Sequence, residues 1–222
     1  MVDLRWMLQQ TAGATVSQGK SDMADTALPA TATATANKAT AEEILDTFPE
    51  LRDVADDTLR ETVVEIWQEV LNESGWQSVG DVPKHPYKVP ASVKLVEHTR
   101  STTQMAVAVA EVVERVQGIP FDRDLLIAAA NLHDVSKLLE FEPSEKGGRA
   151  SRFGHLIQHG FYGAHKMWNK GLPLEMVHNV IVHTATSKYV PQTWEAVIVH
   201  YVDMLDSSAL NLLHGVPATI KD

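Results

Sequence analysis

Ten histidines and no cysteine in a chain of 222 residues make imidazole chemistry the most informative feature of this sequence. The pattern centres on the adjacent pair His133 and Asp134, within the segment NLHDVSK. Further imidazoles and a carboxylate stand at intervals on either side, at His98, His155, His159, His183 and Asp203. Imidazole and carboxylate together suit Fe, Mn, Co, Ni or Zn, and suit Mg less readily. Apart from His155 and His159, each lies on a separate predicted helix, so they share ions only if the helices converge.

The order of these groups resembles the HD-domain superfamily of metal-dependent phosphohydrolases, whose pattern is H…HD…H…H…D. The matching segments are EHTRST at His98, NLHDVSK at His133 and Asp134, QHGFYGAH at His159, VIVHTAT at His183 and HYVDMLD at Asp203. The lysine of HDxxK and the segment KGLP also match. The resemblance covers residues 92–212, about half of the chain.

The resemblance implies a centre with two divalent transition-metal ions, Fe, Mn or Co by preference, with Zn, Ni and Mg as further candidates. It implies a first ion held by His98, His133, Asp134 and Asp203, and a second held by His159 and His183, with Asp134 bridging. Lys137 matches the family lysine that contacts a substrate phosphate. We therefore expect Asp134 and Lys137 to be the catalytic residues.

Other cationic and polar side chains near the predicted centre are candidates for binding the substrate. Arg100 follows His98 by two residues, and Arg152 directly precedes the helix predicted to carry His159. Either guanidinium can bind an anion through two hydrogen bonds, and we prefer Arg152. His155 stands four residues before His159, so both can face one ion if they share a helix. The sequence leaves open whether His155 contacts the substrate or is an additional metal ligand.

The function implied by the resemblance is hydrolysis of a phosphomonoester or phosphodiester of a nucleotide or related small molecule by a metal-activated hydroxide. Paired ions lower the pKa of water and offset negative charge in the transition state. The alternative is an HD-type mixed-valent di-iron oxygenase acting on a small polar or phosphonate-like substrate, because the same ligand order serves both activities. A non-catalytic binding module is disfavoured, because all six ligand positions are filled.

Composition limits the remaining partners. The formal net charge of -10 argues against bulk nucleic-acid binding. The partner that the resemblance implies is a small phosphorylated substrate. The absence of cysteine excludes a disulfide framework, a thiolate metal site and a cysteine nucleophile. No run approaches the ~20 apolar residues that span a membrane, and MVDLRWMLQQ does not resemble a secretory signal. We expect a cytoplasmic protein, and a homodimer is left open.

Apolar spacing predicts an all-α fold with about five core helices and additional N-terminal helices. The resemblance implies that these core helices form an HD-domain helical bundle. Residues 1–39 contain an Ala/Thr-rich segment and are expected to form a disordered tail. Residues 40–91 are expected to hold N-terminal helices, opened by the capping box of Thr40 and Glu43, and a Pro/Gly-rich connection. This connection, residues 74–91, is a candidate wall over the site, because Trp76 and Tyr87 would otherwise be exposed. The HD domain is assigned to residues 92–222, with helices over about 92–116, 122–139, 153–170, 173–183 and from 191 onward.

Overall fold

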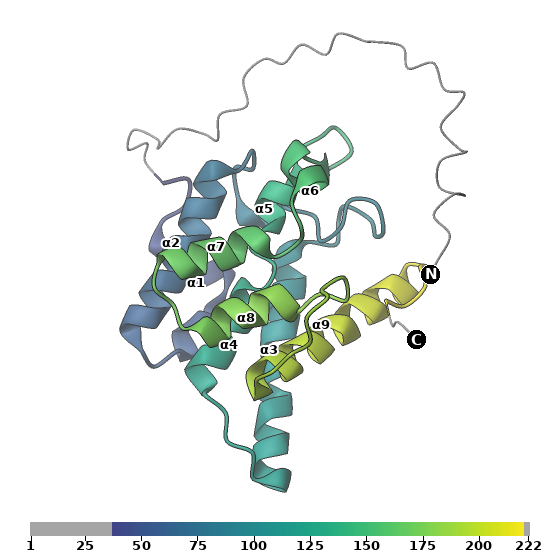
Figure 1. The fold of residues 1–222 in the computed structure, drawn as a ribbon. Coiled ribbons are helices and arrows are strands. Elements are labelled where there is room, and N and C mark those ends of the chain that lie inside the picture. Colours follow the sequence, from purple (N-terminus) through teal and green to yellow (C-terminus); the bar gives the residue numbers. More distant parts are fainter. Residues whose placement is uncertain (1–36, 220–222) are drawn as a thin grey trace, which may run out of the picture. The chain divides into compact units, whose positions relative to one another are not determined.

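Helices make up most of the computed structural model, which describes residues 37–219 (Figure 1). The α-helices are α1 (Ala41–Thr47), α2 (Asp57–Glu73), α3 (Leu95–Gln117), α4 (Arg123–Leu132), α5 (Lys137–Glu140), α6 (Arg152–Leu156), α7 (Phe161–Asn169), α8 (Leu174–Val182) and α9 (Trp194–Leu213). Two 3₁₀ helices, η2 (Pro49–Asp53) and η3 (Val79–Asp81), lie between them. Strands β1 (Phe141–Glu142) and β2 (Arg149–Ala150) form an antiparallel hairpin that pairs Phe141 with Ala150. The predicted all-α bundle is confirmed, with this small hairpin added.

Helix α4 is the buried centre of the bundle and packs against α2, α3, α8 and α9. Its residues Leu126–Leu132 are all buried, so this part of the helix has no face exposed to solvent. Three of them are consecutive alanines, whose small side chains allow neighbouring helices to approach closely. Asp122 caps its first turn by accepting a hydrogen bond from Leu125 N, as the sequence predicts. A helix placed this way carries the residues at its C-terminal end into the interior of the molecule.

The N-terminal helices share this core. Thr40 and Glu43 form the predicted capping box, with Glu43 N donating to Thr40 Oγ1 over 3.2 Å and Thr40 N donating to Glu43 Oε2 over 2.7 Å. On α2, Trp67 is fully buried, and its Nε1 donates to Asn131 Oδ1 of α4 over 2.7 Å. One continuous hydrophobic cluster therefore runs from α1 and α2 to α4 and α8. Residues 40–91 therefore share one hydrophobic core with the helices that follow them.

The expected tail reaches residue 39, and its first 36 residues lie outside the described part of the chain. At residues 37–39 the structure differs from the expectation of disorder. Lys38 Nζ donates to the carbonyl oxygens of Leu71, Ser74 and Trp76 over 3.0, 2.6 and 2.8 Å. An ammonium group at the C-terminal end of α2 satisfies carbonyls that the helix leaves unpaired.

Two predicted helices are interrupted. The helix expected over 122–139 ends at Leu132, and a turn leads into the short α5. The helix expected over 153–170 is broken between α6 and α7, where Gly160 adopts a φ of 81°. Gly171, with a φ of 71°, ends the segment after α7 as predicted, and Pro173 precedes the first turn of α8.

The Pro/Gly-rich connection is ordered and lies against the start of α3. Leu95 N donates to Val82 O and Lys84 N donates to Val93 O, both over 2.9 Å. Trp76 is buried, and its Nε1 donates to Phe141 O over 2.9 Å. Tyr87 differs from expectation: the residue is 65% exposed, although its hydroxyl accepts a hydrogen bond from Ala150 N. No helix within residues 37–219 has the length and apolar character required to cross a membrane.

Candidate metal centre

The turn after α4 places His133 and Asp134 at the centre of the bundle. Both side chains are at most 2% exposed. His133 Nδ1 lies 2.6 Å from Ala130 O, one turn back on α4. A backbone carbonyl only accepts hydrogen bonds, so Nδ1 carries the proton and Nε2 presents a lone pair to the site.

A first group of ligand atoms gathers around Asp134 Oδ2. His98 Nε2, from α3, lies 3.2 Å from this oxygen and 3.3 Å from His133 Nε2. His133 Nε2 is 3.3 Å from the same oxygen. Asp203 Oδ1, from α9, lies 3.2 Å from His98 Nε2 and 3.9 Å from His133 Nε2. Three separate segments thus bring imidazole and carboxylate atoms close to one another.

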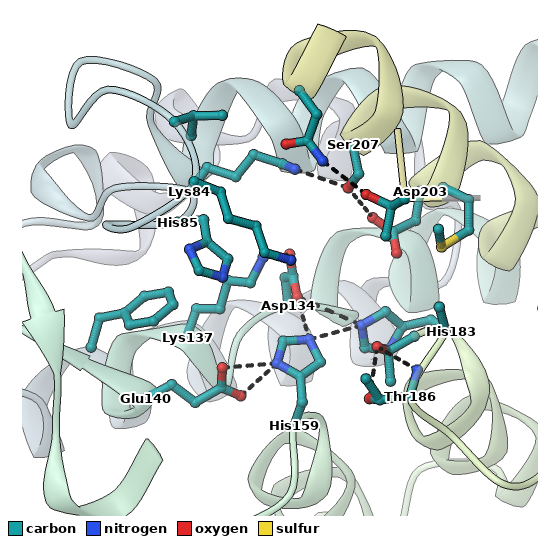
Figure 2. A pocket seen from close by; sticks show the side chains of 18 residues that line it. Lys84, His85, Asp134, Lys137, Glu140, His159, His183, Thr186, Asp203 and Ser207 are labelled. Atoms are coloured by element: carbon teal, nitrogen blue, oxygen red, sulfur yellow. Dashed lines mark hydrogen bonds and ion pairs between the residues drawn. The ribbon is translucent and has the colours of Figure 1, made fainter. Parts of the chain in front are cut away.

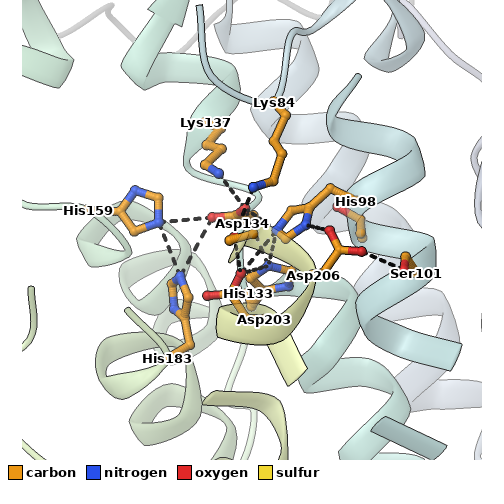
Figure 3. Close-up of polar contacts among 12 residues, drawn as sticks. Lys84, His98, Ser101, His133, Asp134, Lys137, His159, His183, Asp203 and Asp206 are labelled. Carbon is orange, nitrogen blue, oxygen red and sulfur yellow. Dashed lines mark hydrogen bonds and ion pairs between the residues drawn. The ribbon is translucent and has the colours of Figure 1, made fainter. Parts of the chain in front are cut away.

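A second group gathers around the other oxygen of Asp134. His159 Nε2 lies 2.9 Å from Asp134 Oδ1, and His183 Nε2 lies 3.6 Å from it. The two imidazole nitrogens are 3.1 Å apart. Figure 3 shows Asp134 between the two groups, with His159 and His183 on one side and His98 and His133 on the other. The two oxygens of Asp134 therefore face two separate groups of imidazoles.

Each imidazole is oriented by a partner at Nδ1. His183, at the end of α8, lies 2.7 Å from Val180 O, which repeats the arrangement of His133. His98 Nδ1 lies 2.6 Å from Asp206 Oδ2, and Ser101 Oγ donates to the other oxygen of Asp206. His159 Nδ1 lies 2.7 Å from Glu140 Oε1. Outer partners of this kind fix ring orientation at metal sites and raise ligand basicity.

Burial and charge shift the pKa values of these groups strongly. Burial alone would lower the pKa of His98, but hydrogen bonds with Asp134, Asp203 and Asp206 outweigh it and raise this pKa to about 9. For His159, burial is outweighed by Glu140 and Asp134, which raise its pKa to about 10. Burial would raise the pKa of Asp134, but Lys137 and His133 hold it well below the usual range. Asp134 is thus ionised at neutral pH, and the rings of His98 and His159 are stabilised in their cationic form, whereas burial lowers the pKa of His183.

The residues fit a divalent metal. Ligand atoms of His98, His133 and Asp134, and likewise of Asp134, His159 and His183, lie within 4.8 Å of one another, and imidazole with carboxylate is a donor set typical of transition metals. A cation would also offset the cost of burying ionised carboxylates in the interior. The structure therefore brings together all six predicted ligand residues: His98, His133, Asp134, His159, His183 and Asp203.

A cavity of about 290 Å³ opens onto this centre (Figure 2). Charged groups enter it from both sides: Asp134, Asp203 and Glu140 are joined by three lysines, Lys84, Lys88 and Lys137. Lys137 Nζ lies 2.6 Å from Asp134 Oδ2. The remainder of the lining is mostly uncharged and includes Thr184, Thr186 and Met204. An anion of small size would meet cationic groups at this centre.

Three predicted substrate-binding residues do not line this cavity, and the helices explain why. Arg100 lies about 200° around α3 from His98, because successive residues turn by 100°, and its Nε donates to Glu50 over 3.0 Å. Arg152 and His155 lie on α6 with exposed side chains. Because the chain turns between α6 and α7, His155 and His159 do not share a helix, and the i,i+4 relation does not apply.

Other residues at the site were not predicted to act there. Glu140 stands three residues after Lys137, and that spacing could have indicated a second acid facing the centre. Lys84 and His85 come from the Pro/Gly-rich connection, which has no periodicity to indicate direction. Burial lowers the pKa of His85 to about 4, so its ring is neutral at physiological pH.

Comparisons with known proteins add two findings. The sequence model of the family described as HD domain matches residues 95–208, which include all six ligand positions. A curated protein from Methanocaldococcus jannaschii, dihydroneopterin 2′,3′-cyclic phosphate phosphodiesterase, is 30% identical over 167 residues, covering 69% of this chain and 65% of the relative. The chain thus spans just under two thirds of that relative's length. No solved structure matches.

Proposed function

Since the chain belongs to the HD-domain family, we propose that it is a metal-dependent phosphohydrolase that cleaves a phosphate ester of a small molecule. The observation that carries the proposal is Asp134, whose two oxygens each face a separate histidine group beside a cavity lined by lysines. Two ions, Fe, Mn or Co by preference, would be held by His98, His133 and Asp203 on one side and by His159 and His183 on the other.

We propose a phosphodiester as the substrate, with a 2′,3′-cyclic phosphate as the first compound to test. The name of the archaeal relative supports this choice, because it specifies such a bond. A cavity of about 290 Å³ is at the lower end of small-molecule sites, which favours a compact ester over a polymer.

The roles of the residues follow from charge. When bound, divalent ions lower the pKa of water and stabilise negative charge on phosphoryl oxygens. Asp134 stays ionised because Lys137 and His133 hold its pKa low, so both of its oxygens remain available as ligands. Lys137 stays cationic, since Asp134 raises its pKa against the effect of burial, and its ammonium group is positioned to stabilise a phosphoryl oxygen.

The test combines metal analysis with hydrolysis. Purified protein, reconstituted with Mn²⁺, Co²⁺ or Fe²⁺, is assayed for hydrolysis of bis(4-nitrophenyl) phosphate and a ribonucleoside 2′,3′-cyclic phosphate. We expect metal-dependent turnover that Asp134→Ala abolishes together with metal binding, because both groups of ligands lose their shared carboxylate. His165→Ala, an exposed histidine on α7, is the matched control and should keep both.

Two outcomes would overturn this assignment. Turnover that persists in Asp134→Ala would place the chemistry elsewhere. Iron with an oxygen-sensitive mixed-valent EPR signal, together with no hydrolysis of any ester, would favour the oxygenase reading instead.

A further inference from the structure

Lys84 is a buried cation that enters the cavity from outside the part of the chain matched by the HD-domain family. It lies in the connection between η3 and α3, eleven residues before the match begins at residue 95. Its side chain lines the cavity beside Asp134, Lys137 and Asp203, and the residue is only 5% exposed (Figure 2). The ligand order of the sequence gives no reason for a lysine at this position.

The backbone of Lys84 is fixed to the helix that carries His98. Lys84 N donates to Val93 O and Leu95 N donates to Val82 O, both over 2.9 Å, and Pro83 pairs with Lys94 in an isolated antiparallel bridge. Because α3 starts at Leu95, this short ladder sets the position of Lys84 relative to the ligands. The lysine is therefore held in place by backbone hydrogen bonds, and it is not a mobile surface side chain.

The ammonium group of Lys84 lacks a counter-ion in the described part of the chain. Its Nζ donates to Ser207 Oγ over 2.9 Å, and Ser207 Oγ in turn donates to Asp203 Oδ1 over 3.2 Å. Within residues 37–219 no carboxylate oxygen comes within 4.0 Å of this nitrogen, whereas Lys137 Nζ lies 2.6 Å from Asp134. A buried cation without a paired charge is unfavourable unless a ligand supplies one.

The charge is present at physiological pH. Burial and the neighbouring cation Lys137 lower the pKa of Lys84 to about 8, against the opposing effect of the more distant carboxylates Asp134, Asp203 and Asp206, so most molecules carry the ammonium at pH 7. Two ammonium groups that repel each other beside one cavity favour an anion between them.

We propose that Lys84 is a substrate-binding residue that donates hydrogen bonds to a non-bridging phosphoryl oxygen. This inference rests on the proposed phosphohydrolase function, because it assigns a role within the same site. It also makes residues 82–94 the segment through which the N-terminal part of the chain contributes to substrate recognition.

The experiment measures binding of inorganic phosphate to the metal-loaded full-length protein by titration calorimetry. Lys84→Met keeps the length and removes the charge, and we expect its Kd for phosphate to rise at least about tenfold, the effect typical of losing a charge-assisted hydrogen bond. Metal stoichiometry should stay at its wild-type value, and the melting temperature without phosphate should not fall, because the substitution removes a buried charge that has no ion-pair partner. Lys84→Arg keeps the charge and should bind phosphate within about threefold of wild type. Lys94→Met is the matched control: Lys94 lies opposite Pro83 in the same ladder, its Nζ donates to Asp81 O, and it does not line the cavity.

The outcomes separate this inference from the proposed function. Phosphate affinity in Lys84→Met within twofold of wild type, or no phosphate binding by the wild type, would overturn the role of Lys84. Loss of phosphate binding in Lys84→Met while the wild type hydrolyses no ester would leave the anion site standing and reject the phosphohydrolase. If Lys84→Met does not fold, Lys84→Gln is subjected to the same titration and the same criteria.

Discussion

The protonation of His98 and His159 determines how the affinity of this centre for metal depends on pH. The pKa values of His98 and His159 are raised to about 9 and about 10, because carboxylates surround rings that burial alone would keep neutral. Both rings therefore carry an extra proton at pH 7, and a metal must displace it from Nε2. We expect uptake of metal at pH 7 to release about two protons, and the affinity of each group to increase about tenfold per pH unit between pH 6 and 8.

Titration calorimetry in buffers of different ionisation enthalpy measures this release. His159→Ala should lower the number of protons released by about one and empty only the group that contains His183. A metal affinity that stays constant from pH 6 to 8 would contradict the raised pKa values.

The carboxylates behind two of the imidazoles offer a second prediction at this scale. Glu140 holds His159 and Asp206 holds His98, each through Nδ1. We expect Glu140→Gln and Asp206→Asn each to weaken metal binding about 10- to 100-fold, because a neutral amide stabilises the ligand ring less. Glu140→Gln should weaken metal binding at the group that contains His159, and Asp206→Asn should weaken it at the group that contains His98. Competition with a metal-sensitive dye should therefore show one weakened site in each variant. Glu142→Gln is the control, since Glu142 pairs with Arg149 at the surface, and an equal loss there would refute the positioning role.

Among the elements, the break between α6 and α7 does most to shape the second group of ligands. Gly160, with a φ of 81°, allows the chain to turn directly after His159. A Cβ at this position would lie 2.7 Å from Val180 O and 3.6 Å from His183 Cε1. We expect Gly160→Ala to lower the stability by more than the ~1–2 kcal/mol of the left-handed conformation alone, and to weaken metal binding by His159 and His183.

Gly171→Ala provides a matched comparison for this substitution. Gly171 has a φ of 71°, but no described atom lies within 4 Å of the Cβ that alanine would add. Thermal unfolding should therefore show the conformational cost alone, about 1–2 kcal/mol, with metal binding unchanged. Equal losses of stability and metal affinity in the two variants would refute the steric argument at Gly160.

These elements also show what the sequence could predict. The ligand set His98, His133, Asp134 and Asp203 was predictable because the order of these residues matches the pattern of the HD-domain family. Helical periodicity alone did not show that these side chains meet. The break after Leu132 was not, because His133 and Ser136 keep helical dihedral angles and no Gly or Pro marks the turn. Arg100 could have been excluded from the site by its angle around the helix. Lys84 could not have been predicted, because backbone hydrogen bonds between residues 82–84 and 93–95 fix its position, and the sequence of this connection has no helical or strand periodicity.

At the scale of the whole molecule, the family-matched region does not contain its own complete core. The hydrophobic cluster that surrounds Leu132 and Val135 also includes Phe48 and Trp67, both fully buried. Trp67 additionally satisfies Asn131, two residues before His133. The N-terminal helices therefore stabilise the turn that presents the central ligands, and the same part of the chain supplies Lys84 to the cavity.

A chain reduced to residues 92–222 should consequently fail to fold cooperatively, although it retains all six ligand residues. It would expose to water the face of α4 that packs on α2, and it would lose the burial of apolar side chains that the N-terminal helices provide in the full chain. Thermal unfolding followed by circular dichroism, with and without Mn²⁺, measures this. We expect a sharp, metal-stabilised transition for the full chain and a broad transition without metal stabilisation for the fragment. A cooperative transition in the fragment that shifts upward with Mn²⁺ would mean that the HD region folds without the N-terminal helices.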